Sequence, residues 1–501
     1  MNRSALVNIF AKRVIEATDY LDDDKVYLIN QILGIVGESS YMVAPEDSDL
    51  EKLSTLDILD QLIMLSKNNG TLANRQMNED MLGAQLMNLF VPRPSQVNKL
   101  FWTYYQVSPE SATNYLFELS KRSNYIKTRE ISQNISFPAP TNYGELQITI
   151  NLSKPEKDPK AIAAAAAMSH ESNQELQYPA SQLARENEGY WGRLDYAART
   201  NHRVVPLTLG GETWYFQYSP YAYFNEHAIV LSQTIRPMHI DEENMARLLE
   251  FVTQFPDYFI GSNADLPIVG GSILSHDHFQ AGRYELPMAK AAIKQKIHIA
   301  NVTLDEAGVL NWPMTAIRLI DKNKNKLLKA AMHVIKIWHV YDDTSLSIKS
   351  YDENGTPHHT VTPIVRYRHD RYEIDLVLRD NNVSDVFPDG IFHPHPDVQH
   401  IKKENIGLIE VMGLAILPPR LKKELVAVED FLLEKVDHVA SKHQAWADQL
   451  LVSHEVNTEN VENIVQQSVG QIFKRVLEDA GIFKSNDTGQ QGLQKFIHEI
   501  E

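Results

Sequence analysis

Two histidines and a glutamine recur at every second position near the middle of the chain. The segment 270–280 reads Gly-Gly-Ser-Ile-Leu-Ser-His-Asp-His-Phe-Gln, which spaces His276, His278 and Gln280 two residues apart. Side chains alternate between the faces of a β-strand, so a strand here would point all three to one face. A buried polar group without a partner costs about 1–3 kcal/mol, so such a row of polar side chains needs a reason.

This pattern suits covalent transfer of a nucleotidyl group. A neutral imidazole, whose ordinary pKa is about 6.5, is a good nucleophile at phosphorus when one ring nitrogen is free and the other is hydrogen-bonded. The amide of Gln280 could hold a phosphoryl oxygen without adding a charge. The spacing alone leaves two other interpretations open, a pair of structural histidines and a metal-binding pair on an edge strand.

Residues around the histidines are candidates for holding a phosphate or a nucleoside. The turn Gly270-Gly271-Ser272 permits a close backbone approach and presents N–H groups. Asn263 lies beside a turn and could donate to uridine or phosphate, or could only cap that turn. Arg283 and Arg193 could each donate to a diphosphate, although a solvated arginine is the more common finding.

The surrounding elements are predicted to be strands with one helix. Segments 204–209 and 214–218 flank Gly210-Gly211, which predicts a hairpin. Further strands are expected at 227–231 and 258–260. The segment 241–255 has the apolar spacing of a helix, with Asp241 as its N-cap.

The rest of the chain predicts an α+β protein built on antiparallel sheet. Its elements are expected as a helical region to about residue 130, a strand at 146–152, a helix start or linker at the alanine run 163–167, a helical pattern after Pro287, strands at 360–367 and 372–378, and helices from Arg420. We therefore expect three parts: a helical N-terminal region (1–140), a mixed α/β unit carrying the histidines (141–345), and a second mixed unit ending in helices (346–501).

Composition narrows the class of protein. The chain has 501 residues, 65 acidic and 48 basic, with a net charge of −17, which opposes binding to nucleic acid or an anionic membrane. It has no cysteine, which excludes disulfides, a thiol nucleophile and thiolate-bound metals. No stretch approaches the roughly 18 apolar residues of a membrane helix. We expect a cytoplasmic protein with a small anionic substrate.

The histidine segment resembles the His-x-His-x-Gln strand of galactose-1-phosphate uridylyltransferases, of the histidine-triad superfamily. The longer matches are similar to the second, mainly Gram-positive class of that family. They lie at Glu186–Tyr190 with Gly192-Arg193, at Ile268–Ser275, at Asp389–His395 and at Lys402–Gly413. The resemblance covers roughly residues 178 to 420.

The resemblance implies a fold of histidine-triad-like mixed α/β units and a two-step exchange. UMP would pass from UDP-glucose to His278 and then to galactose 1-phosphate, giving UDP-galactose. Gln280 would hold a phosphoryl oxygen, and His276 would orient the strand or a metal. Gly271, Ser272 and Ser275 would lie near the phosphates, and a homodimer is expected.

One departure from the family concerns zinc. Relatives often carry a Cys-x-x-Cys pair before the Glu-Asn block, where this chain has Ser181-Gln182-Leu183-Ala184. The remaining candidate ligands would be His227 and His276, and two imidazoles do not make a closed tetrahedral site. We expect that the structural zinc has been lost and that no cofactor is present.

Three other interpretations remain. His393-Pro394-His395 has similar spacing, but Asp397 stands where a glutamine is needed, so a structural or metal-binding role together with His400 is favoured. The chain could also be another histidine-triad transferase or phosphorylase. It could finally be a UDP-sugar-binding module without catalysis, which would bind UDP-sugar but never become labelled.

Overall fold

The structure is a computed structural model that describes residues 3–42, 48–153, 178–271 and 273–501. The alanine run at 163–167 and Ser272 lie outside the described residues. The contacts between residues divide the chain into two compact units. The first comprises Met1–Thr128, Pro155–Leu207 and Tyr215–Pro220, and the second comprises Arg129–Lys154, Thr208–Trp214 and Tyr221–Glu501. The predicted three-part division into 1–140, 141–345 and 346–501 stays a prediction.

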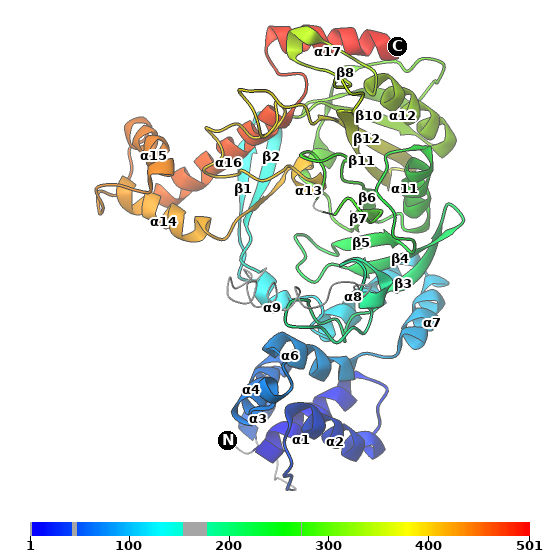
Figure 1. The fold of residues 1–501 in the computed structure, drawn as a ribbon, viewed down its shortest axis with the longest axis vertical. Helices are drawn as coiled ribbons and strands as arrows, with labels where there is room; N and C mark the ends of the chain where they lie inside the picture. The colour runs from blue at the N-terminus through cyan, green and yellow to red at the C-terminus, as the bar shows by residue number, and fades with distance from the viewer. Residues whose placement is uncertain (1–2, 43–47, 154–177, 272) are drawn as a thin grey trace. The chain divides into compact units, whose positions relative to one another are not determined.

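The first unit begins with the helical region expected from the sequence (Figure 1). Its helices are α1 (Arg3–Ala17), α2 (Lys25–Val36), α3 (Ser48–Glu51), α4 (Thr55–Asn68), α5 (Thr71–Asn74), α6 (Glu79–Met87), α7 (Pro94–Tyr105) and α8 (Pro109–Arg122). Local signals set their starts: the side chain of Ser54 accepts from the backbone N–H of Asp57 at the start of α4. Apolar side chains of α1, α2, α4 and α6 share one buried core.

A sheet of ten strands carries the histidine segment. Its order is β3-β4-β5-β7-β6-β11-β12-β10-β9-β8. The strands are β3 (Val205–Leu209), β4 (Glu212–Tyr218), β5 (Ala228–Ser232), β6 (Phe259–Gly261), β7 (His278–Gly282), β8 (Ile293–Lys296), β9 (Glu306–Leu310), β10 (Ala316–Asp321), β11 (His359–Arg368) and β12 (Arg371–Asp380). From β5 to β8 every neighbouring pair is antiparallel. The predicted α+β class with antiparallel sheet is confirmed.

Two long helices pack on this sheet in the second unit. They are α11 (Glu242–Gln254) and α12 (Lys324–Trp338), which lie side by side (Figure 1). Asp241 caps α11, as predicted, by accepting from the N–H of Asn244 at 2.8 Å. The predicted turn at Gly210-Gly211 is also present, with φ values of 61° and 77° that glycine adopts without strain.

A smaller sheet and a group of helices complete the second unit. Strands β1 (Ile135–Thr141), β2 (Gly144–Ile150) and β13 (Leu414–Leu417) form a three-stranded sheet, in which β13 runs parallel to β2. The helices are α9 (Thr128–Ile131), α13 (Leu408–Val411), α14 (Leu421–Leu432), α15 (Ser441–Ser453), α16 (Val461–Ala480) and α17 (Asp487–Ile500). Short 3₁₀ turns lie at Asp22–Asp24, Asn88–Phe90, Arg185–Asn187, Pro287–Lys290 and Thr344–Leu346.

One predicted segment was wrong. The region after Pro287 was expected to be helical, but β8, β9 and β10 come first and α12 begins only at Lys324. Every residue of β10 is buried, so its sequence lacks the alternation of a half-exposed strand. A short run of buried residues cannot be told from a helix by its periodicity.

Candidate active site

Strand β7 places His278 and Gln280 on one face, as the spacing predicted. Across the ladder, His278 lies opposite Leu231 of β5, and Gln280 lies between Ile229 of β5 and Gly261 of β6. The strand begins at His278, so His276 precedes it. The predicted alternation within one strand therefore holds for His278 and Gln280 only.

His278 is held as a neutral imidazole with a defined free nitrogen. Its ring is 6% exposed, and Nδ1 donates to the carbonyl oxygen of His276 at 2.7 Å. A carbonyl can only accept, so the proton of the neutral ring is on Nδ1 and the lone pair is on Nε2. Burial lowers the pKa of His278 to about 4, against which the bond to His276 acts. Among the described residues, none makes a hydrogen bond to this Nε2.

His276 fixes the backbone that holds His278. Its side chain is fully buried, and Nε2 donates to the carbonyl oxygen of Ser232 at 2.8 Å. The next residue, Asp277, pairs its backbone with Ser232 and Arg236. His276 thus contacts His278 through its carbonyl oxygen. The role expected for it, orienting the strand or a metal, stays a prediction.

The opposite face of the segment is a structural one. The carboxylate of Asp277 accepts from Nε of Arg236 at 3.3 Å, and burial raises its pKa while that arginine acts in the other direction. Phe279 stacks on Trp214 with ring centroids 4.8 Å apart. These contacts anchor one side of the segment, so that its other side is free for His278 and Gln280.

Gln280 is oriented by a histidine that the motif does not contain. Nε2 of His227 lies 3.0 Å from Oε1 of Gln280. From the sequence, His227 was expected only as a remaining candidate ligand for zinc. Its contact with Gln280 joins residues 53 apart, and no local pattern indicates such a contact. Knowledge of the β5–β7 pairing would have been needed to find it.

The glycine turn lies against Asn263. A Cβ on Gly271 would come within 2.7 Å of Nδ2 of Asn263, so only glycine lets this amide approach the backbone. A Cβ on Gly270 would lie 2.5 Å from two carbonyl oxygens. The structure therefore brings Asn263 and Gly271 together and leaves Ser275 exposed. Their roles toward a phosphate stay predictions. Ser272 is outside the described residues.

The segment Lys402–Gly413, far along the chain, contacts Asn263 beside the same turn. Oδ1 of Asn263 accepts from the backbone N–H of Leu408 at 2.9 Å. Two residues earlier, the carbonyl oxygen of Ile406 accepts a hydrogen bond from the guanidinium of the buried Arg379 at 2.9 Å. The segment Lys402–Gly413 is thereby joined to Asn263, although 145 positions separate the two bonded residues.

The two predicted arginine ligands have other partners. Arg283, one residue beyond β7, donates from Nε to the buried carboxylate of Glu226 at 2.7 Å. About 16 Å of extended chain separates it from His278. Arg193, in the first unit, donates to Asp195 at 3.0 Å and to the carbonyl oxygen of Tyr178 at 2.8 Å. Their roles toward a diphosphate stay predictions.

The second-half histidines do not share one site. His393 contacts Asn405 at 3.2 Å, and His395 contacts the carbonyl oxygen of Ile391 at 3.1 Å. His400 instead contacts His443. Over the described ranges, no group of three or more His, Cys, Asp or Glu side chains could hold a metal.

The candidate zinc ligands also do not fit that metal. His276 and His227 each direct Nε2 to a protein oxygen, on Ser232 and Gln280 respectively. Neutral hydroxyl, amide and aliphatic side chains at 181–184 are poor substitutes for thiolates. The loss of the zinc stays a prediction.

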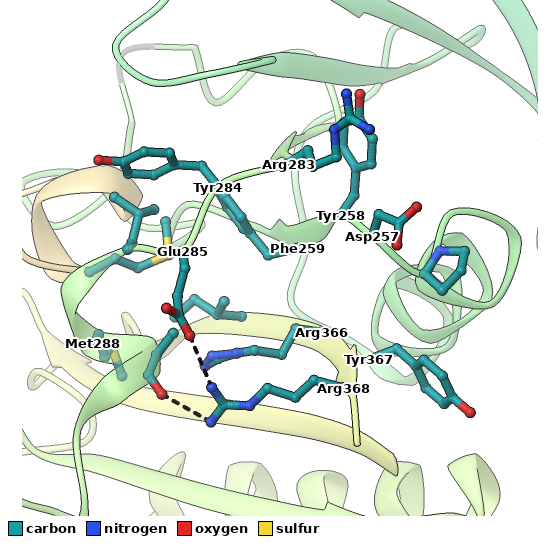
Figure 2. Close-up of a pocket in the computed structure, with 15 residues that line it drawn as sticks. Asp257, Tyr258, Phe259, Arg283, Tyr284, Glu285, Met288, Arg366, Tyr367 and Arg368 are labelled. Atoms are coloured by element: carbon teal, nitrogen blue, oxygen red, sulfur yellow. Dashed lines mark hydrogen bonds and ion pairs between the residues drawn. The ribbon is translucent and has the colours of Figure 1, made fainter. Parts of the chain in front are cut away.

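A cavity of about 310 Å³ lies beyond the other end of β7 (Figure 2). Arg283, Arg366 and Arg368 line it together with tyrosines 258, 284 and 367. These arginines are already paired with carboxylates: Arg283 with Glu226, Arg366 with Asp375, and Arg368 with Glu373. His278 and Gln280 are not among its lining residues, so this cavity is separate from the candidate active site.

Comparisons with known proteins identify the family. Two family models match, "Galactose-1-phosphate uridyl transferase, N-terminal domain" over residues 18–237 and "C-terminal domain" over residues 250–448. The chain is 52% identical to the galactose-1-phosphate uridylyltransferase of Pediococcus pentosaceus, covering 98% of this chain and 99% of that one. It is 50% identical to the enzyme of that name from Lactococcus lactis, covering 95% of each. The chain belongs to the galactose-1-phosphate uridylyltransferase family.

A more distant likeness exists among solved structures. Yeast Ap4A phosphorylase Apa2 in complex with Ap4A has a TM-score of 0.37 and 10% identity, covering 74% of this chain and 95% of that one. A likeness of this size carries no conclusion about the activity of the chain. In a separate finding, no helix of the described residues is long and apolar enough to cross a membrane.

Proposed function

We propose that this chain transfers UMP from UDP-glucose to galactose 1-phosphate through a uridylyl intermediate on His278. The observation that carries the proposal is the state of that ring, which is neutral, buried and hydrogen-bonded through Nδ1. Nε2 therefore has a lone pair available at neutral pH. Membership of the uridylyltransferase family supplies the reaction that this nucleophile serves.

In the first step, Nε2 of His278 attacks the α-phosphorus of UDP-glucose. A P–N bond forms, and the bond from that phosphorus to the bridging oxygen breaks. Glucose 1-phosphate leaves with the electron pair. In the second step, a phosphate oxygen of galactose 1-phosphate attacks the same phosphorus, the P–N bond breaks, and UDP-galactose leaves with His278 neutral again.

Neighbouring groups would stabilise the charge on the transferred phosphoryl group. Gln280 presents an amide nitrogen on the same strand face and would donate to a non-bridging oxygen. Asn263 and the backbone at Gly271 and Ser275 would hold the phosphates, with Ser272, Arg193 and Arg283 as further candidates. His276 would keep the nucleophile oriented through its carbonyl oxygen.

The proposal includes the setting of the enzyme. The substrates are UDP-glucose and galactose 1-phosphate, no resident cofactor takes part, and the compartment is the cytoplasm. A homodimer is the expected assembly. The loss of both zinc-binding cysteines supports the absence of a cofactor.

The test is intact-protein mass spectrometry after mixing the enzyme with UDP-glucose alone. The reaction is quenched in base because a phosphoramidate is labile in acid. We expect a uridylyl adduct in the wild type and in the control His395→Ala, and none in His278→Ala. An adduct that persists in His278→Ala but disappears in His395→Ala would move the nucleophile to the second half. UDP-glucose binding without any adduct would indicate a binding module instead.

A further inference from the structure

His227 occupies a position from which it controls the catalytic glutamine. It immediately precedes β5, where the register Ala228↔Ala281 and Ile229↔Gln280 places it on the same sheet face as Gln280. Its side chain is 3% exposed. The 3.0 Å contact between His227 Nε2 and Gln280 Oε1 is therefore a buried hydrogen bond between neighbouring strands.

The chemistry of this bond fixes the orientation of the Gln280 amide. A carbonyl oxygen can only accept, so His227 must carry its proton on Nε2 and donate it. With Oε1 held by His227, the NH₂ group of Gln280 is directed away from His227. Within the described residues, no protein group accepts a hydrogen bond from that nitrogen. Both of its protons remain available for a phosphoryl oxygen.

We propose that His227 is a positioning residue for uridylyl transfer, which holds the Gln280 amide with its NH₂ group toward the phosphorus. This inference rests on the proposed function, because it concerns how Gln280 meets the transferred group. If the amide turned over, its carbonyl oxygen would face the phosphoryl oxygens and repel them. A donor bonded to Oε1 prevents that rotation without itself touching the substrate.

The surroundings hold His227 in this single orientation. Its ring lies 4.6 Å from that of Phe224 and 5.5 Å from that of Tyr223. The last residue of β7 is Gly282, where a Cβ would come within 2.4 Å of Phe224. The glycine thus makes room for the aromatic ring that packs against the histidine.

The preceding residue anchors the same turn. Glu226 has a φ of 53° and a fully buried carboxylate, which binds Arg283 and Tyr258. Asn225 also donates to the backbone carbonyl oxygen of Arg283 at 3.3 Å. The turn before β5 is consequently tied to the end of β7, and the distance between His227 and Gln280 is fixed by contacts on either side of them.

The other ring nitrogen of His227 supports the same arrangement. Burial lowers the pKa of His227 to about 4, and the bond to Gln280 acts in the opposite direction. Nδ1 is buried without a hydrogen-bond partner in the described structure, so a second proton there would have no acceptor. The ring therefore remains a single donor aimed at Oε1.

The test compares His227→Leu, which removes the donor at similar volume, with His227→Gln, whose amide nitrogen can replace Nε2. The measurement is the single-turnover rate of uridylyl adduct formation from UDP-glucose, together with its dependence on UDP-glucose concentration. We expect His227→Leu to slow adduct formation by about tenfold to a hundredfold, with less than a threefold change in the half-saturating concentration. His227→Gln should recover most of the rate.

The matched control is His202→Leu, which removes a donor from an equally buried histidine bonded to another glutamine, Gln217. It should leave the rate of adduct formation unchanged. In a Gln280→Ala background, His227→Leu should cause no further loss of rate, because His227 acts through Gln280. A residue with a merely structural role would still lower the rate in that background.

Two results would overturn the inference. One is an unchanged rate in His227→Leu while the wild type still labels His278, which leaves the proposed function intact. The other is an equal loss in His227→Leu whether or not Gln280 is present, which would make the role one of folding. If the wild type itself forms no adduct, the proposed function fails and the inference fails with it.

Discussion

Two buried histidine–glutamine pairs, one in each unit, use the same hydrogen bond for different ends. In the first unit, Nε2 of His202 lies 2.8 Å from Oε1 of Gln217. In the second unit, Nε2 of His227 lies 3.0 Å from Oε1 of Gln280. Both rings are at most 3% exposed, and burial lowers the pKa of His202 to about 3 and that of His227 to about 4.

The difference lies in the glutamine. Gln217 is itself buried, and its histidine partner stacks on Tyr125 with ring centroids 4.3 Å apart. Gln280 is partly exposed and stands two residues from His278. The same local chemistry thus satisfies a buried polar group in one place, and in the other, under the proposed mechanism, it directs a donor toward a reacting phosphorus. The role of such a hydrogen bond therefore depends on the strand that carries the glutamine and on the residues beside it.

The two pairs should differ most in how the rate of uridylyl adduct formation responds to removal of the glutamine. Gln280→Leu and Gln217→Leu both leave a histidine without its partner, so both should destabilise the fold by about 1–3 kcal/mol. Under the proposed mechanism, only Gln280→Leu also removes a donor to the phosphoryl oxygen. We expect it to slow uridylyl adduct formation by about a hundredfold to a thousandfold, measured in single-turnover experiments with UDP-glucose.

Gln217→Leu should form the adduct at the wild-type rate once the protein is folded, as checked by urea denaturation. Equal losses of rate in the two variants would break the comparison, since Gln280 would then act through stability rather than through the phosphoryl group.

In acid, by contrast, the two pairs should behave alike. His202 and His227 are neutral in the fold, whereas an unfolded histidine has a pKa of about 6.5. Between pH 6.5 and about 4 the unfolded state therefore binds more protons, and stability falls as the pH falls. Each histidine contributes at most about 1.4 kcal/mol per pH unit to that fall. His202→Leu and His227→Leu should both reduce the slope, measured from urea unfolding at several pH values.

The slopes of stability against pH can also be compared between His202→Leu and His227→Leu. They should agree, because the effect depends on burial and not on catalysis. A variant that keeps the full wild-type slope would indicate that its histidine is already charged in the folded protein.

The smallest effect should come from the glycine that makes room beside His227. Gly282→Ala would push its methyl group into Phe224, whose ring packs on His227. We expect a loss of about 1–3 kcal/mol in stability from overpacking and a two- to fivefold slower adduct formation. The measurements are the urea midpoint and the single-turnover rate.

Gly211→Ala is the control, because Gly211 has a φ of 77° with open space around its Cβ position. Backbone strain should lower its stability by about 1 kcal/mol without changing the rate. If Gly282→Ala slowed the reaction no more than Gly211→Ala, the packing of Phe224 would not be what holds His227 in place.

Much of the local structure followed from the sequence. The capping of α11 by Asp241, the glycine turn between β3 and β4, and the helical N-terminal region were all predicted correctly. Each rests on interactions among residues close in the chain. The strands after Pro287 were missed because β10 is buried on both faces, where alternation is lost.

The candidate site divides in the same way. The sequence identified His278 and Gln280 from their spacing, and the close approach of Gly271 from the absence of its side chain. It gave no indication that Leu408 bonds Asn263 or that Glu226 holds Arg283. Those contacts join segments whose pairing depends on the order of strands in the sheet.

By itself, then, the sequence determined which side chains are candidates for the chemistry and that two of them share one face of β7, because alternation along a strand is a property of the backbone. Only the tertiary structure decided which ring nitrogen of His278 is free and which way the Gln280 amide points. Those choices are made by His276 and His227, through a backbone carbonyl oxygen and a neighbouring strand. A hydrogen-bond partner is selected by position in space, which spacing along the chain does not specify.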